Sequence, residues 1–512
     1  MKEKHGKITS IVLIIIFFAG LLYIFRLPPF IDNEEPGPPE IKDIKKTEIP
    51  AQTKQQIQPT APIANSASQS VYEAYNKSMQ KGDEYAKKEY YSLAINEYRN
   101  AASILPGSVE PLNAIGKIYF IQRNPEKAIE AFKEAISMGA KDIDTKINLG
   151  RAYLQNKDIK NAKQIFDEIN NDNQLTYYYK SLIALYNGDY ENAKNLLSQA
   201  QNGSNEWIRA QVSNFFKAFT EFSAFEGEQP SYLKTLIAKA MNQAGEYGVS
   251  IPLLKNVIKE KPDYRDAWIL LGYAYLNNLQ IKDAIETFEQ ARKLDPSKPE
   301  TLFFLGLAYF ADNKIDNAIN YIESSLEKGF EPRIQAYQKL AELYFIKKDY
   351  EKSVKAYETV LGINSGNIDY FVRPMWIYIE KLNNPSAALS LAQTALIKHP
   401  SDAMAYNLMG WAYMNMGNYQ LAKQNFDAAI KLNPQLAAVY LNMGQMYEKM
   451  EYYLTAKEYY KQAFELDKNN SSIGATAAER YNRIVQKEQR QKISEPRGVI
   501  YQVNTFKAPY SK

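Results

Sequence analysis

Few residues of this chain are suited to catalysis or to metal binding. Its 512 residues include no cysteine, which excludes disulfides, thiolate nucleophiles and zinc sites with sulfur ligands. The two histidines are His5, ahead of an apolar segment, and His399, beside Pro400 in a predicted loop. A catalytic triad or a histidine metal site needs an imidazole held in position, so we expect neither.

Acidic residues are numerous, but no motif organises them into a site. The chain has 58 acidic and 62 basic residues and a formal net charge of +4, which is too balanced to indicate a nucleic-acid partner. It contains no Gly-rich phosphate loop, G-x-S-x-G elbow or H-E-x-x-H pair. We therefore predict no enzymatic activity, catalytic residue, cofactor or metal, and interpret the charges as solvated helix faces.

A period of 34 residues runs through residues 72–470. The stretch DAWILLGYAYLNNLQIKDAIETFEQARKLDP (266–296) contains Gly272, and Gly306 follows in the next unit. Seven glycines share one register: Gly82, Gly116, Gly150, Gly272, Gly306, Gly410 and Gly444. Each is followed by an aromatic residue after three positions, an alanine after twelve and a large apolar residue after sixteen. Such a period indicates a stacked-repeat protein.

Each unit has two amphipathic halves. Apolar residues recur at i, i+3, i+4 and i+7 on both sides of a short polar turn such as NNLQIKD, which predicts two antiparallel helices. Glycine inside a helix costs about 1 kcal/mol relative to alanine, so we expect Gly272, facing Ala284, to let the two helices approach closely. Tyr275 and Phe288 would fill the space beside this contact, and Pro296 would end the second helix.

This pattern resembles the tetratricopeptide repeat family. Its Trp, Leu, Gly, Tyr, Ala, Phe, Ala and Pro positions are matched by Trp268, Leu271, Gly272, Tyr275, Ala284, Phe288, Ala291 and Pro296. Degenerate units centred on Ser181, Ala238, Ala341 and Trp376 bring the total to about eleven. The resemblance implies an all-α solenoid of stacked helix hairpins. Pro374 falls inside the first helix of the Trp376 unit, where we expect a kink or a shifted register.

One segment has the composition of a membrane anchor. Residues 8–25 are 18 residues without a charge, roughly 27 Å long as a helix. Three lysines precede them, so the segment predicts a single-pass membrane protein with its N-terminus in the cytoplasm and its repeats outside the cytoplasm. A cleaved signal peptide is the alternative.

The remaining organisation follows from composition and register. In chain order we predict a cytoplasmic N-terminus (1–7), a transmembrane helix (8–25), a Pro-rich disordered linker (26–70), a first repeat array (71–200), an irregular extra helix (201–230), a second array (231–470), a capping helix (471–494) and a C-terminal tail (495–512).

The resemblance also implies where a ligand binds. In this family the ligand-facing positions are the second, fifth, ninth, twelfth and thirteenth of each unit, on the first helix, which lines the concave face. They predict a peptide-binding groove formed by Ile269, Tyr273, Leu276, Phe303, Leu307, Phe310, Phe345, Asn407, Trp411 and Met414. The alternative is that these side chains only pack against neighbouring helices.

The expected function is protein binding. One variant of the family holds a C-terminal carboxylate with Lys and Asn residues of its first units, but the equivalent positions here supply no cation: Met79, Asp83, Ala114, Asp144 and Asn148. We expect a membrane-anchored scaffold or adaptor that binds peptide segments of partner proteins in envelope assembly or secretion. A cytosol-facing organellar import or chaperone receptor and a regulatory subunit of an enzyme complex remain alternatives.

Overall fold

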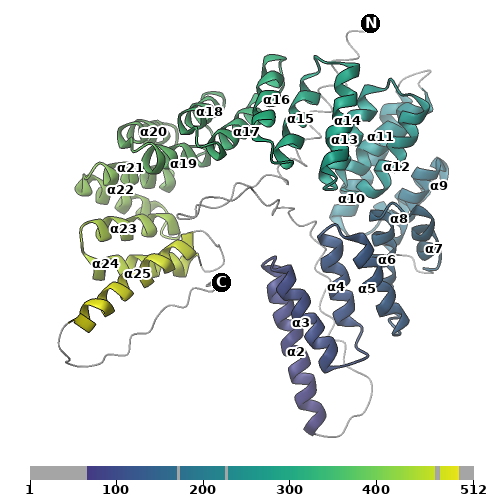
Figure 1. Cartoon of the computed structure of the whole chain (residues 1–512), viewed down its shortest axis with the longest axis horizontal. Helices are drawn as coiled ribbons and strands as arrows, with labels where there is room; N and C mark the ends of the chain where they lie inside the picture. Colours follow the sequence, from purple (N-terminus) through teal and green to yellow (C-terminus); the bar gives the residue numbers. More distant parts are fainter. Residues whose placement is uncertain (1–65, 170–172, 225–228, 468–472, 495–512) are drawn as a thin grey trace. The chain divides into compact units, whose positions relative to one another are not determined.

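The computed structural model describes residues 66–169, 173–224, 229–467 and 473–494 (Figure 1). This part of the chain is an all-α solenoid that contains no strand. It divides into two compact units, the first ending at Asp312 and the second beginning at Asn313. The division lies in the turn between the two helices of the Gly306 repeat.

The first unit contains four helix pairs, one single helix, two further pairs and a last helix. They are α2 (Ser66–Lys87), α3 (Tyr91–Ile104), α4 (Glu110–Ile121), α5 (Pro125–Ser137), α6 (Ile143–Gln155), α7 (Ile159–Asp167), α8 (Gln174–Asn187), α9 (Tyr190–Gln201), α10 (Glu206–Ser223), α11 (Pro230–Gln243), α12 (Tyr247–Glu260), α13 (Arg265–Asn277), α14 (Ile281–Leu294) and α15 (Pro299–Ala311). The single helix is α10, in the segment where the sequence predicts an extra helix.

The second unit begins with one helix, continues with four pairs and ends with a long helix. They are α16 (Ile315–Glu327), α17 (Arg333–Ile346), α18 (Tyr350–Ile363), α19 (Asp369–Trp376) with the π-helix η1 (Ile377–Lys381), α20 (Pro385–Lys398), α21 (Ala403–Asn415), α22 (Tyr419–Leu432), α23 (Ala437–Lys449), α24 (Tyr453–Leu466) and α25 (Ile473–Ser494). The last helix packs against α24 and α23, as a lid over the final apolar face would.

The turn inside each repeat confirms the predicted register, including the degenerate units. The residue seven positions after each central position has a positive φ: Glu89, Arg123, Lys157, Gly188, Gly245, Leu279, Asn313, Lys348, Asn383, Gly417 and Glu451. In six repeats the next residue is an Asp or Asn that caps the second helix by accepting a backbone N–H: Asn124, Asp158, Asp189, Asp349, Asn384 and Asn418.

The repeated glycines make room for an aromatic ring. A Cβ atom on Gly272 would lie 2.6 Å from the ring of Phe288, a side chain with no exposed surface. Five other glycines would meet the ring sixteen residues later at 2.5–2.6 Å: Gly82, Gly116, Gly150, Gly410 and Gly444. The close approach expected at this position is therefore between one helix backbone and a ring of the next helix.

In the first unit, α12 packs on helices that are distant in the sequence. A Cβ atom on Gly248, the second residue of α12, would lie 2.0 Å from the carbonyl oxygen of Leu154 at the end of α6. Nearby, Lys157 Nζ donates a hydrogen bond to Gln280 Oε1 at 2.7 Å, and α12 also contacts α8. Repeats of a regular solenoid contact only their neighbours, so this contact closes the first unit on itself.

The structure corrects the predicted localisation as a single-pass membrane protein. Within the described ranges, no helix has both the length and the apolar character needed to cross a bilayer. The very apolar α15 has only 13 residues, about 20 Å, which is shorter than a hydrocarbon core. Residues 8–25, on which the prediction rested, lie outside the described residues, and the expected role in envelope assembly loses its basis.

Candidate peptide-binding surfaces

The structure places nine of the ten predicted groove residues in the packed interior. In the first unit, at most 7% of each side chain is exposed on α13 (Ile269, Tyr273 and Leu276) and on α15 (Phe303, Leu307 and Phe310). In the second unit, Asn407, Trp411 and Met414 on α21 are at most 9% exposed. Phe345, on α17, is the one residue of the ten that is partly exposed.

The buried residues have close partners within their own unit. The ring of Tyr273 packs edge-on against Tyr247 at 6.4 Å and against Phe304 at 6.0 Å between ring centroids. Asn407 Oδ1 accepts a hydrogen bond of 3.0 Å from Asn442 Nδ2, one repeat further on. These contacts join each first helix to helices of the neighbouring repeats.

The first unit contains an arginine that lies against two aromatic rings. Arg151, on α6, has its guanidinium carbon 4.7 Å from the ring centroid of Phe120 and 5.6 Å from that of Tyr179. Phe120 belongs to α4 and Tyr179 to α8, so the three side chains link three consecutive first helices. Cation–π contacts of this kind contribute about 0.5–1 kcal/mol at exposed sites and more when desolvated.

A carboxylate of the same unit joins this arginine. Glu246 precedes α12, and burial raises the pKa of its carboxyl group to about 7, although Arg151, Arg123 and a hydrogen bond from Tyr179 each act to lower it. Arg123 in turn lies 5.4 Å from the ring centroid of Tyr247. The fold-back of α12 therefore supplies an acidic side chain to two arginines of the first three helix pairs.

The second unit has a similar group of side chains, which we name the arginine–aromatic cluster: Phe345, Arg373, Trp376 and Lys381. The guanidinium carbon of Arg373 is 4.6 Å from the ring centroid of Phe345 and 5.1 Å from that of Trp376. The two rings are 5.7 Å apart, and Lys381 Nζ is 5.0 Å from the Trp376 ring. Two cations thus lie against one pair of aromatic rings.

Several polar side chains of the same unit are paired, one of them with the cluster. Arg373 hydrogen-bonds the hydroxyl of Tyr357, and burial raises the pKa of that tyrosine to about 12. On α17, Lys339 forms an ion pair with Glu342. Burial lowers the pKa of Lys339, and Glu342 opposes this shift. Two repeats further on, Lys449 Nζ donates to Asn415 Oδ1 at 2.9 Å.

The cluster owes its position to the irregular first helix of its repeat. Pro374 cannot donate a backbone hydrogen bond, and the chain passes from α19 into the π-helix η1 directly after Trp376. The first helix of this repeat is thus irregular next to Pro374, and the turn at Asn383 shows that the predicted register is unchanged. The five residues of η1 carry Lys381, the second cation of the cluster.

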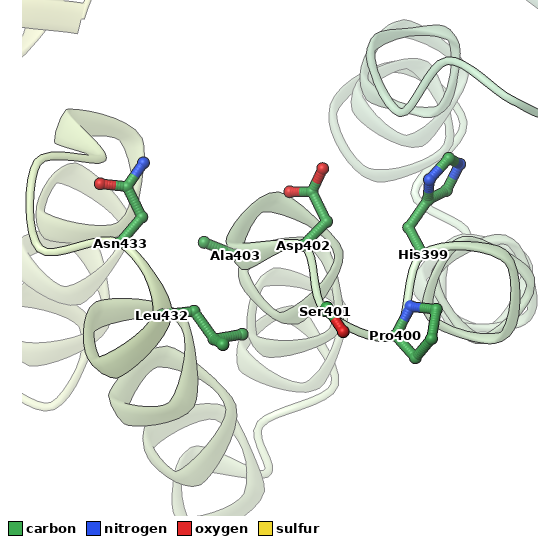
Figure 2. Close-up of a pocket in the computed structure, with 7 residues that line it drawn as sticks. All are labelled: His399, Pro400, Ser401, Asp402, Ala403, Leu432 and Asn433. Carbon is green, nitrogen blue, oxygen red and sulfur yellow. The ribbon is translucent and has the colours of Figure 1, made fainter.

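One open hollow lies in the second unit, between the α20–α21 loop and the end of α22 (Figure 2). Its volume is about 460 Å³, and its lining includes His399, Asp402 and Leu432. The polar groups already have partners, because His399 Nε2 bonds the carbonyl oxygen of Ser365 at 2.8 Å and Asp402 caps α21. Among the described residues, no group of three or more His, Asp or Glu side chains could hold a metal ion.

Both arginines occupy positions that the family resemblance marks as ligand-facing. Arg151 is at the ninth position of the Gly150 unit, and Arg373 is at the fifth position of the Trp376 unit. The predicted groove consisted mainly of apolar and aromatic residues at these positions and therefore did not include either arginine. The signal available in the sequence was a basic residue at a ligand-facing position whose preceding unit has an aromatic residue at another such position.

Comparisons with known proteins agree with this architecture. Models described as tetratricopeptide repeat match residues 119–186 and 241–300, residues 334–367 and 437–470, and residues 403–436. Similar proteins include the BBSome complex member BBS4 of Bos taurus, 23% identical over 284 residues, which are 53% of this chain and 54% of that protein. The peroxisomal targeting signal receptor of Saccharomyces cerevisiae is 24% identical over 184 residues, or 35% of this chain and 30% of the receptor.

The chain therefore spans about half or less of the length of these relatives. Among solved structures, MamA is 22% identical, with a TM-score of 0.27 over 40% of this chain and 93% of that protein. YrrB, described as a TPR protein with an unusual peptide-binding site, is 18% identical, with a TM-score of 0.26 over 44% of this chain and 97% of that protein.

Proposed function

We propose that the second unit binds acidic peptide segments of partner proteins at the arginine–aromatic cluster. The chain carries tetratricopeptide repeats, which serve as scaffolds for protein–protein interaction. One observation carries the proposal. In the first unit an arginine that lies against two aromatic rings has the carboxyl group of Glu246 beside it. In the second unit Arg373 lies against two aromatic rings in the same way. This arrangement suits a carboxylate from another molecule.

The two sites are built from related positions. Phe120 and Phe345 both occupy the twelfth position of their units, and in each case the arginine comes from the first helix of the following unit. A guanidinium group presents planar donors that match a carboxylate, and an aromatic ring fixes its plane. Arg373 is thus prepared to bind one Asp or Glu side chain of a ligand.

The surroundings favour an extended ligand. Phe345 is the predicted groove residue that keeps exposed surface, and Asn415 and Lys449 offer partly exposed polar groups on later first helices. A peptide that anchors a carboxylate on Arg373 reaches these groups by running across α21 and α23. The buried groove residues Asn407, Trp411 and Met414 would then support the surface from below.

The test is a binding measurement with two synthetic peptides, one of repeated Glu-Pro and one of repeated Gln-Pro, each with a fluorescent label. The full chain binds the Glu-Pro peptide more tightly, and Arg373→Ala removes the difference. Charge-assisted hydrogen bonds contribute about 1.5–3 kcal/mol, so the loss is roughly 10-fold to 100-fold in Kd.

Arg333→Ala is the matched control, because Arg333 lies on α17 and its guanidinium group lies against Tyr337 of the same helix, 5.6 Å from the ring centroid and hydrogen-bonded to the hydroxyl. It should leave the Kd unchanged. The measurement is repeated on the variant D32N/E34Q/E35Q, which removes acidic side chains of the chain itself that could compete. Equal Kd values for the two peptides in both chains would refute the proposal.

A further inference from the structure

We propose that Lys239, on α11 of the first unit, is a reactive lysine that is modified by small activated acyl donors of the acyl phosphate class. The inference rests on the surroundings of its side chain, which is buried and whose ammonium group makes no ion pair. It concerns the first unit and does not depend on the peptide site proposed for the second unit. Its test can therefore fail or succeed independently of the proposed function.

The helix that carries Lys239 is almost enclosed. Ten of the 14 residues of α11 are buried, and α10, α12 and α13 pack against it. Lys239 itself is 8% exposed. A lysine is rarely buried unless its charge is paired, because removing an ammonium group from water is costly. Lys239 therefore needs either a partner or an uncharged form.

No partner is present among the described residues. Lys239 Nζ has neither a hydrogen bond nor an ion pair within these ranges. The polar side chains one turn away on the same helix are engaged elsewhere. The hydroxyl of Thr235 donates to the carbonyl oxygen of Ser231 at 2.8 Å, and Asn242 Nδ2 donates to the carbonyl oxygen of Leu270 at 3.0 Å.

Two other lysines provide the comparison. Lys339, the second buried lysine of the described ranges, is 6% exposed and forms an ion pair with Glu342. Lys234, on α11 itself, has its Nζ atom 2.7 Å from a carboxylate oxygen of Glu260. Lys239 thus differs from both, because no direct contact compensates its charge.

The charged groups around Lys239 offset only part of the effect of burial. Burial lowers the pKa of Lys239, whereas the carboxylates of Glu221 on α10 and Asp266 on α13 act to raise it. The described residues of α12 add no charged group to this balance. Asp266 already forms an ion pair of 2.8 Å with Arg265, and Glu221 accepts a hydrogen bond from Tyr232. More of the amine is therefore neutral at pH 7 than in a solvated lysine, and only the neutral amine is a nucleophile.

The amine can still be reached by a small reagent. The fully enclosed polar atoms that lack a partner include Thr176 Oγ1 and Tyr178 OH of α8, but not Lys239 Nζ. The stem of a lysine packs along apolar neighbours while its head reaches toward water, so the exposed part of Lys239 is at its reactive end. Lys239 follows Ala238, the central residue of its repeat, and thus has the ninth position, which the family resemblance marks as ligand-facing.

The reaction needs only the amine and the acyl donor. The neutral Nζ atom attacks the carbonyl carbon of the acyl phosphate, a C–N bond forms, and the C–O bond to phosphate breaks. The departing phosphate takes up the proton that the nitrogen releases, so the products are an amide and hydrogen phosphate. The amide carries no charge, which removes the cost of a buried unpaired ammonium group. Acylation therefore takes one positive charge from a ligand-facing position of the first unit.

The test treats the full chain with acetyl phosphate and measures the acetylation rate of each lysine by mass spectrometry. At pH 7.5, Lys239 should react at least about threefold faster than Lys234, which is paired with Glu260 on the same helix pair. A lysine in a small peptide has a pKa of about 10.4, so its rate rises about 100-fold between pH 7 and pH 9. The rise for Lys239 should be smaller. A rate below that of Lys234, or a full 100-fold rise, would overturn the proposal.

A pair of substitutions tests the missing partner without using reactivity. Lys239→Met removes the ammonium group and leaves no ionic partner behind, so hydrogen exchange in α11 should stay unchanged or become slower. Lys339→Met is the matched control, because it takes the cation away from Glu342 and should speed exchange in α17. Faster exchange in α11 of Lys239→Met would mean that the charge has a partner after all, and the proposal would fail.

Discussion

Replacing Gly248 by alanine tests the contact that closes the first unit. The new Cβ atom would lie 2.0 Å from the Leu154 carbonyl oxygen and 2.7 Å from the Gln155 Cα atom. Both are backbone atoms, so they cannot rotate away as a side chain would. Forcing extra volume into a packed contact costs about 1–3 kcal/mol, occasionally more, and this case belongs at the upper end.

Helix propensity acts in the opposite direction. Alanine is favoured over glycine inside a helix by about 1 kcal/mol, so the net destabilisation expected for Gly248→Ala is about 2 kcal/mol. Gly362 provides the matched control, because it lies inside α18 and a Cβ atom there would meet nothing within 4 Å. Gly362→Ala should therefore stabilise its unit by up to about 1 kcal/mol.

The assay is amide hydrogen exchange with peptide-level mass spectrometry, combined with urea denaturation. Repeat arrays unfold in parts, so exchange is needed to locate the effect. Gly248→Ala should speed exchange at the end of α6 and the start of α12, and leave α18 unaffected. If Gly248→Ala is as stable as the natural chain, α12 does not pack on α6 and the reasoning about the first unit fails.

Three other substitutions follow from the packing and charge of single residues. Because burial raises the pKa of Glu246 from 4.5 to about 7, the folded chain keeps a proton between these values that the unfolded chain has released. Stability should therefore fall as pH rises from about 4.5 to about 7. Urea midpoints measured across this range should show a smaller slope for Glu246→Gln, and an unchanged slope would contradict the assignment. Phe288→Ala should destabilise the α13–α14 hairpin by about 3–5 kcal/mol, seen as faster exchange there, since the Phe288 side chain is fully buried over Gly272. Asn442→Ala should cost about 1–3 kcal/mol by urea denaturation, because Asn407 Oδ1 loses its buried donor; the double variant N407L/N442L should cost less.

The features predictable from sequence are those fixed within one repeat. The spacing from Gly272 to Phe288 depends only on two consecutive helices and their turn, so the 34-residue period gives it directly. The same period placed the degenerate units, and the turn residues Gly188, Gly245, Lys348 and Asn383 confirm their registers. Pro374 indicated a kink, but a missing backbone donor does not specify that the helix continues as a π-helix.

Contacts between distant repeats could not be predicted in this way. Gly248 and Leu154 are 94 residues apart, and the 34-residue period relates only residues within a repeat or in adjacent repeats. Glu246 occupies the turn of a degenerate repeat, where an acidic residue normally faces solvent. Only the path of the chain through the first unit brings it to Arg151, and that path depends on how successive helix pairs stack.

The inserted helix accounts for a difference in packing between the first and the second unit. In the first unit α10 separates the fourth and fifth helix pairs and packs on α9, α8 and α11, which shifts the following pairs from the regular path. As a result α12 reaches α6 and α8, and Glu246 meets Arg151. The second unit has no inserted helix among its described residues, and its principal contacts join helices that are adjacent or next but one in the chain. A regular stack cannot fold one of its own turns onto Arg373.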